Sequence, residues 1–134
     1  MRPFLLVPVV ACLFACGSPA PGGSCDTIGF LCHDQVNALE CQLGKWVSLP
    51  CRGPSGCQRQ GNTITCDMSA NVEGDFCASS AVGSGLCTAD GTGTLECRND
   101  PASGTNSLKK TNTCRSCSVV RNMTTMKDEV VCQP

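Results

Sequence analysis

Residues 39–52 read LECQLGKWVSLPCR and combine a tight turn with two cysteines. The glycine-containing pair Leu43-Gly44 separates two short β-prone runs, which predicts an antiparallel hairpin. Cys41 lies in the first run, and Cys51 follows the second. Because an isolated hairpin is only marginally stable in water, this pattern predicts a scaffold that disulfide bonds hold together.

Cysteine dominates the composition of the chain, with 14 of 134 residues. About one cysteine in ten residues is typical of a short secreted protein that disulfides cross-link. Fourteen cysteines in a reducing cytosol would need several metal sites, yet the chain has one histidine and a single Cys-x-x-Cys pair. We therefore expect an oxidising compartment, no metal site and no cofactor.

Charge and aromatic content limit the function classes further. The formal net charge is −1 and there is no basic run, so the chain lacks the electrostatic pattern of a nucleic-acid-binding protein. One Trp, four Phe and no Tyr cannot build a large apolar core. Disulfides, at about 2–4 kcal/mol each, are expected to supply the stability that burial does not.

Residues 1–15 predict a lipoprotein signal peptide. Arg2 supplies a positive charge, and the apolar segment 4–15 has the length of a secretory signal rather than of a transmembrane helix. The sequence Leu13-Phe14-Ala15-Cys16 resembles a bacterial lipobox, whose cysteine is acylated and becomes the mature N-terminus. We expect the signal to be removed and Cys16 to carry the lipid.

Two alternatives concern this lipidated residue. Val9-Val10-Ala11-Cys12 fits the lipobox pattern more literally but leaves an apolar segment too short for export. If Cys12 leaves with the signal and Cys16 is acylated, 12 of the 14 cysteines remain, an even number that can pair completely. The other alternative is a plain secreted protein in which Cys16 is structural.

Acylation of Cys16 would anchor the protein to a membrane without spanning it. In lipoproteins of this kind, an Asp after the acylated cysteine commonly retains the protein at the inner membrane. Gly17 occupies that position, which implies the bacterial outer membrane, with the protein periplasmic or surface-exposed. Residues 16–24 are rich in Gly, Pro and Ser and are expected to form a flexible tether.

The other twelve cysteines fall into two sets of six. We expect a small, disulfide-rich, mostly β fold with two tandem six-cysteine units of short hairpins, at residues 25–66 and 77–132, joined by a linker at residues 67–76. Pairing is expected within each unit, and the sequence leaves all 15 connectivities of six cysteines open. The cysteines expected in disulfides are Cys25, Cys32, Cys41, Cys51, Cys57, Cys66, Cys77, Cys87, Cys97, Cys114, Cys117 and Cys132.

Local matches indicate that the second unit repeats the first. Leu39-Glu40-Cys41 matches Leu95-Glu96-Cys97, and Cys51-Arg52 matches Cys114-Arg115. The second unit is longer, chiefly through Asn99–Asn112, whose Pro, Gly, Ser, Thr and Lys content predicts a surface loop.

Other turn residues predict the remaining strands. Gln60-Gly61-Asn62 separates two β-prone runs in the first unit, and Asp90-Gly91 predicts a turn before Thr94–Glu96 in the second. Ser118–Arg121 is expected to pair with Asp128–Val131.

Three features have some resemblance to chemical sites. Cys114-Arg115-Ser116-Cys117 has the spacing of a dithiol redox motif, but no helix start lies beside it to lower a thiol pKa. His33 is the only imidazole and has no nucleophile motif beside it, and Asp90–Gly93 lacks the alternating ligands of a calcium loop. We expect no catalytic residue and no enzyme, with an envelope thiol oxidoreductase using Cys114 and Cys117 as an alternative.

Trp46 is the one candidate contact residue. Trp is enriched at binding hot spots, although a single Trp in a poor core is more often packed. A glycan-binding surface module is therefore a further alternative, which the chain supports weakly because it has no Tyr and few other aromatic residues.

The whole chain resembles a known group of envelope proteins. Its lipobox, its tether and the pattern Gly-x-x-Cys…Leu-Glu-Cys…Gly-Lys-Trp…Pro-Cys-Arg-Gly are similar to the small cysteine-rich outer-membrane lipoproteins of myxobacteria. Some of these, the contact-transferable gliding-motility lipoproteins, are accessory components of an envelope-spanning motility machine. The resemblance implies a lipid-anchored, non-catalytic structural or adaptor protein with a protein partner in a motility or surface-adhesion complex.

Overall fold

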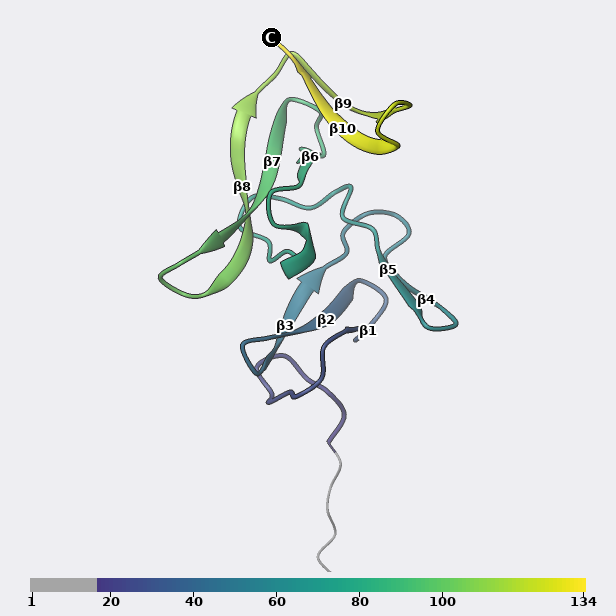
Figure 1. Cartoon of the computed structure of the whole chain (residues 1–134), viewed down its shortest axis with the longest axis vertical. Coiled ribbons are helices and arrows are strands. Elements are labelled where there is room, and N and C mark those ends of the chain that lie inside the picture. The colour runs from purple at the N-terminus through teal and green to yellow at the C-terminus, as the bar shows by residue number, and fades with distance from the viewer. Residues whose placement is uncertain (1–16) are drawn as a thin grey trace, which may run out of the picture.

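The computed structural model describes residues 17–134, so the expected signal peptide and Cys16 lie outside the described residues. Its regular structure is almost entirely antiparallel β, which confirms the predicted small, disulfide-rich β fold. Each six-cysteine unit contains a three-stranded sheet followed by a two-stranded hairpin (Figure 1).

The strands follow the chain in order within each unit. The first unit contains β1 (Phe30–Cys32), β2 (Asn37–Gln42), β3 (Lys45–Pro50), β4 (Cys57–Gln60) and β5 (Thr63–Cys66). The second contains the short 3-10 helix η1 (Ser79–Ala81), then β6 (Gly85–Cys87), β7 (Gly93–Asp100), β8 (Thr105–Thr113), β9 (Ser116–Asn122) and β10 (Lys127–Gln133). The three hairpins predicted around Gly44, around Gly61 and between Ser118 and Val131 are confirmed.

The sheets β1-β2-β3 and β6-β7-β8 have the same strand order and the same register, except for an irregularity in β7–β8 between Thr94 and Leu95. The Leu31–Leu39 pair of the first sheet corresponds to the Leu86–Leu95 pair of the second. In the same way, the Cys41–Trp46 pair corresponds to the Cys97–Leu108 pair. Leu39 and Leu95, at equivalent positions of the two middle strands, are fully buried. The short strands β1 and β6 were not predicted, since three residues are too few to show an alternating pattern.

Disulfide bonds follow one order in both units. The first cysteine pairs with the third, the second with the fifth and the fourth with the sixth. The bonds are Cys25–Cys41, Cys32–Cys57, Cys51–Cys66, Cys77–Cys97, Cys87–Cys117 and Cys114–Cys132. The expected pairing within each unit is therefore present, with one of the 15 connectivities selected.

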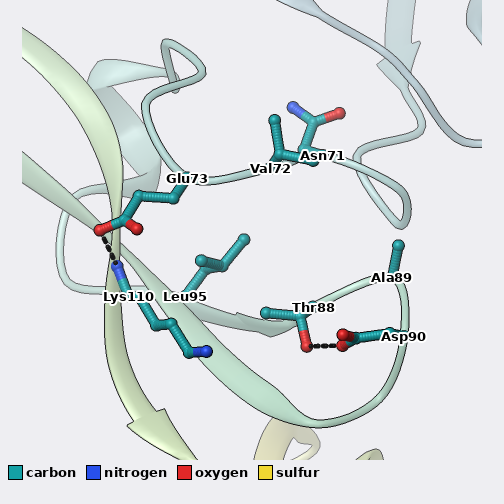
Figure 2. A pocket seen from close by; sticks show the side chains of 8 residues that line it. All are labelled: Asn71, Val72, Glu73, Thr88, Ala89, Asp90, Leu95 and Lys110. Carbon is teal, nitrogen blue, oxygen red and sulfur yellow. Dashed lines mark hydrogen bonds between the residues drawn. The ribbon is translucent and has the colours of Figure 1, made fainter.

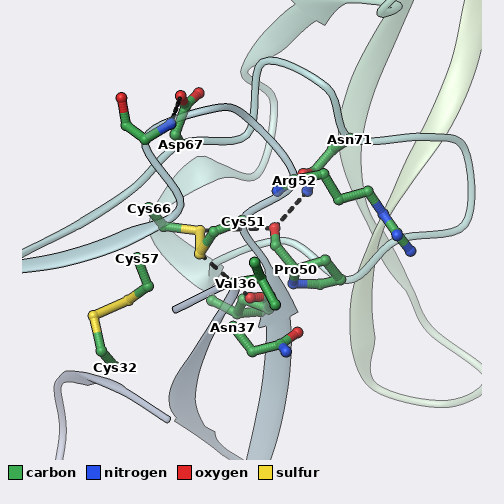
Figure 3. The surroundings of a disulfide bond; sticks show 12 residues. Cys32, Val36, Asn37, Pro50, Cys51, Arg52, Cys57, Cys66, Asp67 and Asn71 are labelled. Atoms are coloured by element: carbon green, nitrogen blue, oxygen red, sulfur yellow. Dashed lines mark hydrogen bonds between the residues drawn. A yellow bond between two sulfur atoms is a disulfide. The ribbon is translucent and has the colours of Figure 1, made fainter. Parts of the chain in front are cut away.

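Two of these disulfides join each hairpin to both edges of its sheet. Cys57 and Cys66 face each other at the base of β4–β5. Cys57 is bonded to Cys32 at the end of edge strand β1, and Cys66 is bonded to Cys51 just after edge strand β3 (Figure 3). In the second unit, Cys117 and Cys132 occupy the corresponding positions and have corresponding partners.

Half-cystines form much of the two small cores. One core contains Ala38, Leu49 and Cys51, and the other contains Cys77, Leu95, Cys97 and Leu108. These clusters are too small to stabilise two independent domains by burial alone, so covalent cross-links carry a large share of the stability.

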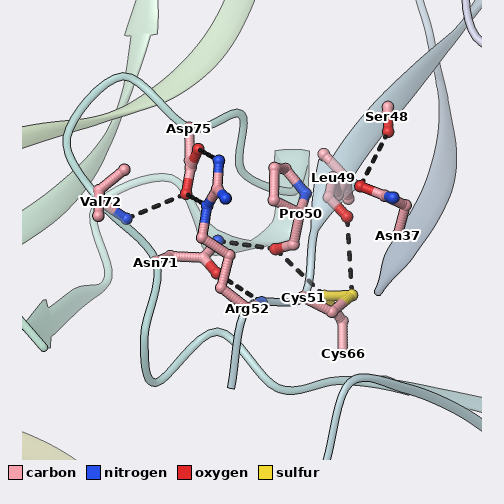
Figure 4. Close-up of polar contacts among 10 residues, drawn as sticks. All are labelled: Asn37, Ser48, Leu49, Pro50, Cys51, Arg52, Cys66, Asn71, Val72 and Asp75. Atoms are coloured by element: carbon pink, nitrogen blue, oxygen red, sulfur yellow. Dashed lines mark hydrogen bonds and ion pairs between the residues drawn. A yellow bond between two sulfur atoms is a disulfide. The ribbon is translucent and has the colours of Figure 1, made fainter. Parts of the chain in front are cut away.

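Residues 67–76, expected to form a linker, pack between the two units. The buried Asn71 amide donates to the Pro50 carbonyl (2.7 Å), and its carbonyl oxygen accepts from the Arg52 N–H (3.1 Å) (Figure 4). On the other side, the N–H of Gly74 donates to the carbonyl of Leu108 in β8 (2.8 Å). This segment therefore contacts the end of β3 in one unit and β8 in the other.

An ion pair reinforces this joint. The Arg52 guanidinium lies 2.8 Å and 3.0 Å from the two carboxylate oxygens of Asp75, which also accepts from the Val72 N–H. Burial opposes ionisation of Asp75, but the Arg52 and Val72 hydrogen bonds outweigh it and hold the pKa of this carboxyl below its usual value. The ionised pair thus ties the end of the first unit to the segment that enters the second.

Polar groups of β2 form a second contact between the units. The Glu40 carboxylate is buried and accepts from the N–H of Ser79 at 3.0 Å. Gln42, also buried, donates its amide to the carbonyl of Cys77 (3.2 Å) and to Glu40. The units therefore meet through buried hydrogen bonds, with Ala78 of the second unit also packed against the small core of the first.

The surface loop predicted at Asn99–Asn112 is wrong. Strand β7 continues to Asp100, β8 begins at Thr105, and only residues 101–104 form the turn. Asn106, Ser107 and Leu108 are buried on this long hairpin despite a loop-like composition. Polar residues there pair across the strands, for example through the Asn99 amide and the Asn106 carbonyl oxygen at 2.9 Å.

Replacing Asn71 with Ala should destabilise the protein. The change removes the buried Asn71 amide and leaves the half-buried Pro50 carbonyl and the Arg52 N–H without their partner, a loss of about 1–3 kcal/mol. The free energy of unfolding in guanidinium chloride, with the disulfides intact, measures this effect. The same substitution at Asn62, an exposed turn residue, should change it by less than about 0.5 kcal/mol. Equal losses in the two variants would contradict the assigned role of Asn71.

Candidate functional site

Trp46, the predicted contact residue, lies at the start of β3, where the tether joins the sheet. Its N–H donates to the carbonyl of Gly23 and its carbonyl accepts from the N–H of Gly22, both at 2.8 Å. Ser24 bridges to Lys45, whose ammonium lies 3.3 Å from the Ser24 hydroxyl. The last residues of the tether therefore pair with the outer edge of β3.

The Trp46 side chain is partly buried beside a hollow of about 420 Å³. Tether residues, including Pro19 and Ala20, form most of its wall, together with Asp26. Among the residues that the structure describes, no second aromatic side chain lines this hollow. A sugar ring bound there would have a single stacking surface.

The β9–β10 hairpin carries a set of exposed apolar side chains, which we call the apolar hairpin surface. Its members are Val119, Val120, Met123, Met126 and Val131. Val120 and Val131 lie on one face of the hairpin, Val119 lies on the other face, and the two methionines lie in the turn. Figure 1 places this hairpin at the end of the molecule opposite the N-terminal segment.

The corresponding hairpin of the first unit is polar. Strands β4 and β5 have the same register between their cysteines but present Gln58, Arg59, Gln60, Thr63 and Thr65 to solvent. Both hairpins are attached by equivalent disulfide pairs. The fold therefore does not require the apolar residues of the second hairpin.

Cys114 and Cys117 do not form a bond with each other. Cys114 is bonded to Cys132, and Cys117 is bonded to Cys87. The two half-cystines thus belong to separate cross-links, one at each side of the hairpin base. This arrangement lacks the dithiol–disulfide couple that a Cys-x-x-Cys oxidoreductase uses.

His33 and Asp34 lie in the connection between β1 and β2. Asp34 accepts from the Val36 N–H (2.8 Å) and from the Asn37 amide, and these hydrogen bonds lower the pKa of its carboxyl. Asp34 therefore stabilises a turn instead of orienting an imidazole. No group of three His, Cys, Asp or Glu within residues 17–134 is arranged to hold a metal ion.

A second hollow, of about 280 Å³, lies between residues 71–73 and the 88–90 turn (Figure 2). Asp90 accepts from the Thr88 hydroxyl (2.6 Å) and the Thr92 N–H (3.0 Å), which lower the pKa of Asp90 to about 2. The Glu73 carboxylate accepts from the Lys110 N–H at 3.0 Å. Because both carboxylates serve turn or strand hydrogen bonds, this hollow contains no catalytic pair.

No protein-family model, no curated protein and no solved structure matches the chain. In the described part of the chain, no helix is long and apolar enough to cross a membrane. Function must therefore be argued from the residues themselves.

The apolar hairpin surface was not predicted from the sequence. Its signal is the contrast between residues 57–66 and 117–132, and this contrast becomes visible only when the two pairs of cysteines are aligned. The order of the cysteines along the chain already offers this alignment, but the exposure of the side chains between them is seen only in the folded protein.

Peptide mapping of the non-reduced protein tests the cysteine assignment. The Cys114 peptide should be linked to Cys132 and the Cys117 peptide to Cys87, and neither thiol should react with iodoacetamide before reduction. Mass spectrometry of the digest measures both properties. A Cys114–Cys117 link, or selective alkylation of this pair at a mild reducing potential, would support the oxidoreductase instead.

Proposed function

We propose that the protein is a lipid-anchored, non-catalytic structural or adaptor lipoprotein of the bacterial outer membrane. The lipobox-like sequence that ends at Cys16, followed by Gly17, supports the anchor. The six disulfides, which engage every cysteine of residues 17–134, support a scaffold rather than a thiol enzyme. The scaffold would hold two β units at a short distance from the membrane.

The apolar hairpin surface carries the adaptor proposal. Exposed apolar side chains that lie together are unfavourable in water and often mark protein-interaction sites, and Val120 and Val131 lie on the same face of this hairpin. The polar β4–β5 hairpin indicates that they are not needed for folding. Since β9–β10 lies away from the tether, an anchored molecule would present it to a protein partner in the envelope (Figure 1).

The two units are proposed to derive from an internal duplication. The shared disulfide order, strand order and cross-strand register support this origin. After such a duplication, the first unit would serve the anchored end and the second would serve the partner.

A gliding-motility or surface-adhesion complex is the proposed setting. Its support is the resemblance of the lipobox, the tether and the cysteine pattern to myxobacterial lipoproteins. Gliding and surface assembly that remain unchanged after deletion of the gene would contradict this setting.

Site-specific photo-crosslinking in living cells tests the adaptor proposal. A photoreactive residue at Met123, in the exposed β9–β10 turn, should give one discrete protein adduct, because apolar surface drives the contact. The same residue at Asn62, in the β4–β5 turn, should give none. Gel shift and mass spectrometry of the adduct are the measurements.

Charge substitutions provide the matched control for this contact. Val120→Lys with Val131→Lys should remove the Met123 adduct. Lysines at the equivalent positions Gln60 and Thr65 should leave it in place. Equal crosslinking at both turns, or an adduct that survives Val120→Lys with Val131→Lys, would contradict the proposal. Retention on chitin, cellulose or peptidoglycan that Trp46→Ala abolishes would favour the glycan-binding alternative.

A further inference from the structure

Trp46 and Leu108 occupy the same register position in the two sheets but have different surroundings. Each lies opposite the third cysteine of its unit. Leu108 is fully buried, whereas Trp46 is only partly buried and has the tether beside it. A role in the core explains why Leu108 is present in the second unit. It does not explain the larger, amphipathic Trp46 in the first unit.

The tether fixes Trp46 close to the expected lipid. Gly22 is hydrogen-bonded to the Trp46 carbonyl, so only residues 17–21 separate Cys16 from a fixed point on β3. Six Cα steps of at most about 3.5 Å place the Cα of Gly22, which is hydrogen-bonded to β3, within about 21 Å of an acylated Cys16. The β3 edge would therefore lie close to the membrane surface whatever path the tether takes.

Other residues around this end of the sheet suit a lipid interface. Ile28 is fully exposed, three residues after a half-cystine bonded to Cys41, which lies opposite Trp46. The nearby charges, Asp26 and Lys45, are of opposite sign. Trp side chains favour the membrane–water interface, where the ring is buried among lipid carbons and the indole N–H stays hydrated.

We propose that, in the lipid-anchored protein, the side chains of Trp46 and Ile28 lie in the interfacial region of the bilayer that holds the acyl chains. This inference rests on the proposed acylation of Cys16. This contact would fix the orientation of the first unit relative to the membrane, with the β9–β10 hairpin directed away from the bilayer.

Tryptophan fluorescence tests this placement directly, because Trp46 is the only tryptophan in the chain. The acylated full-length mature protein is inserted into phosphatidylethanolamine–phosphatidylglycerol vesicles, with or without bromine on the acyl chains. Bromine near the headgroup should quench Trp46 emission about twofold, and bromine near the chain end should quench it less. Ile28→Ser should reduce the quenching.

A relocated tryptophan serves as the control. In the acylated Trp46→Phe, Met123→Trp variant, the probe lies on the distal hairpin and its emission should be unaffected by bromine. Equal quenching of the two proteins, or none of either in a preparation whose mass includes the acyl chains, would overturn the placement of Trp46. A mature mass without acyl chains would overturn the proposed anchor itself, and the two failures are therefore distinguishable.

Discussion

The cross-link at the base of each hairpin is the constraint on which this molecule depends. Two cysteines face each other across the base of each two-stranded hairpin and form two separate disulfides. One disulfide leads to one edge strand of the adjacent sheet, and the other leads to the opposite edge strand. The hairpin and the sheet become one unit without a large apolar core between them. A chain with one Trp and no Tyr could hardly achieve this arrangement by burial.

Covalent attachment also frees the hairpin surfaces from a folding role. Residues between Cys57 and Cys66 are polar apart from Gly61 and the half-buried Ile64, whereas those between Cys117 and Cys132 include Val119, Val120 and Met123. Both hairpins keep the same register. The two units therefore share a framework but differ in what they expose. The contacts of Asn71, Arg52 and Asp75 hold one unit against the other. The exposed surfaces of the two units therefore keep a fixed orientation relative to each other.

The sequence predicted those parts of the fold that short-range turn chemistry controls. Leu43-Gly44 and Gly61 mark hairpins whose strands pair locally, and the even number of cysteines indicated pairing within each unit. The long β7–β8 hairpin was missed because its stability comes from cross-strand pairing of polar residues such as Asn99 and Asn106, which single-residue preferences assign to loops.

The candidate site was harder to predict. Trp46 could be singled out by its rarity, but its hydrogen bonds to Gly22 and Gly23 join segments that lie far apart in the sequence. The cysteine order aligns the two hairpins, but the exposure of the apolar side chains on β9–β10 is a property of the folded chain. Both features depend on how distant segments are arranged in the folded chain, and composition and spacing do not determine that arrangement.

The intact mass of the mature protein extracted from membranes tests the central claim, an acylated anchor joined to a fully cross-linked scaffold. The account predicts a chain that begins at an acylated Cys16. It also predicts a mass lower than that of the reduced form by two hydrogens for each of the six disulfides. A mass that includes an unmodified Met1, or several cysteines that alkylate without reduction, would contradict it.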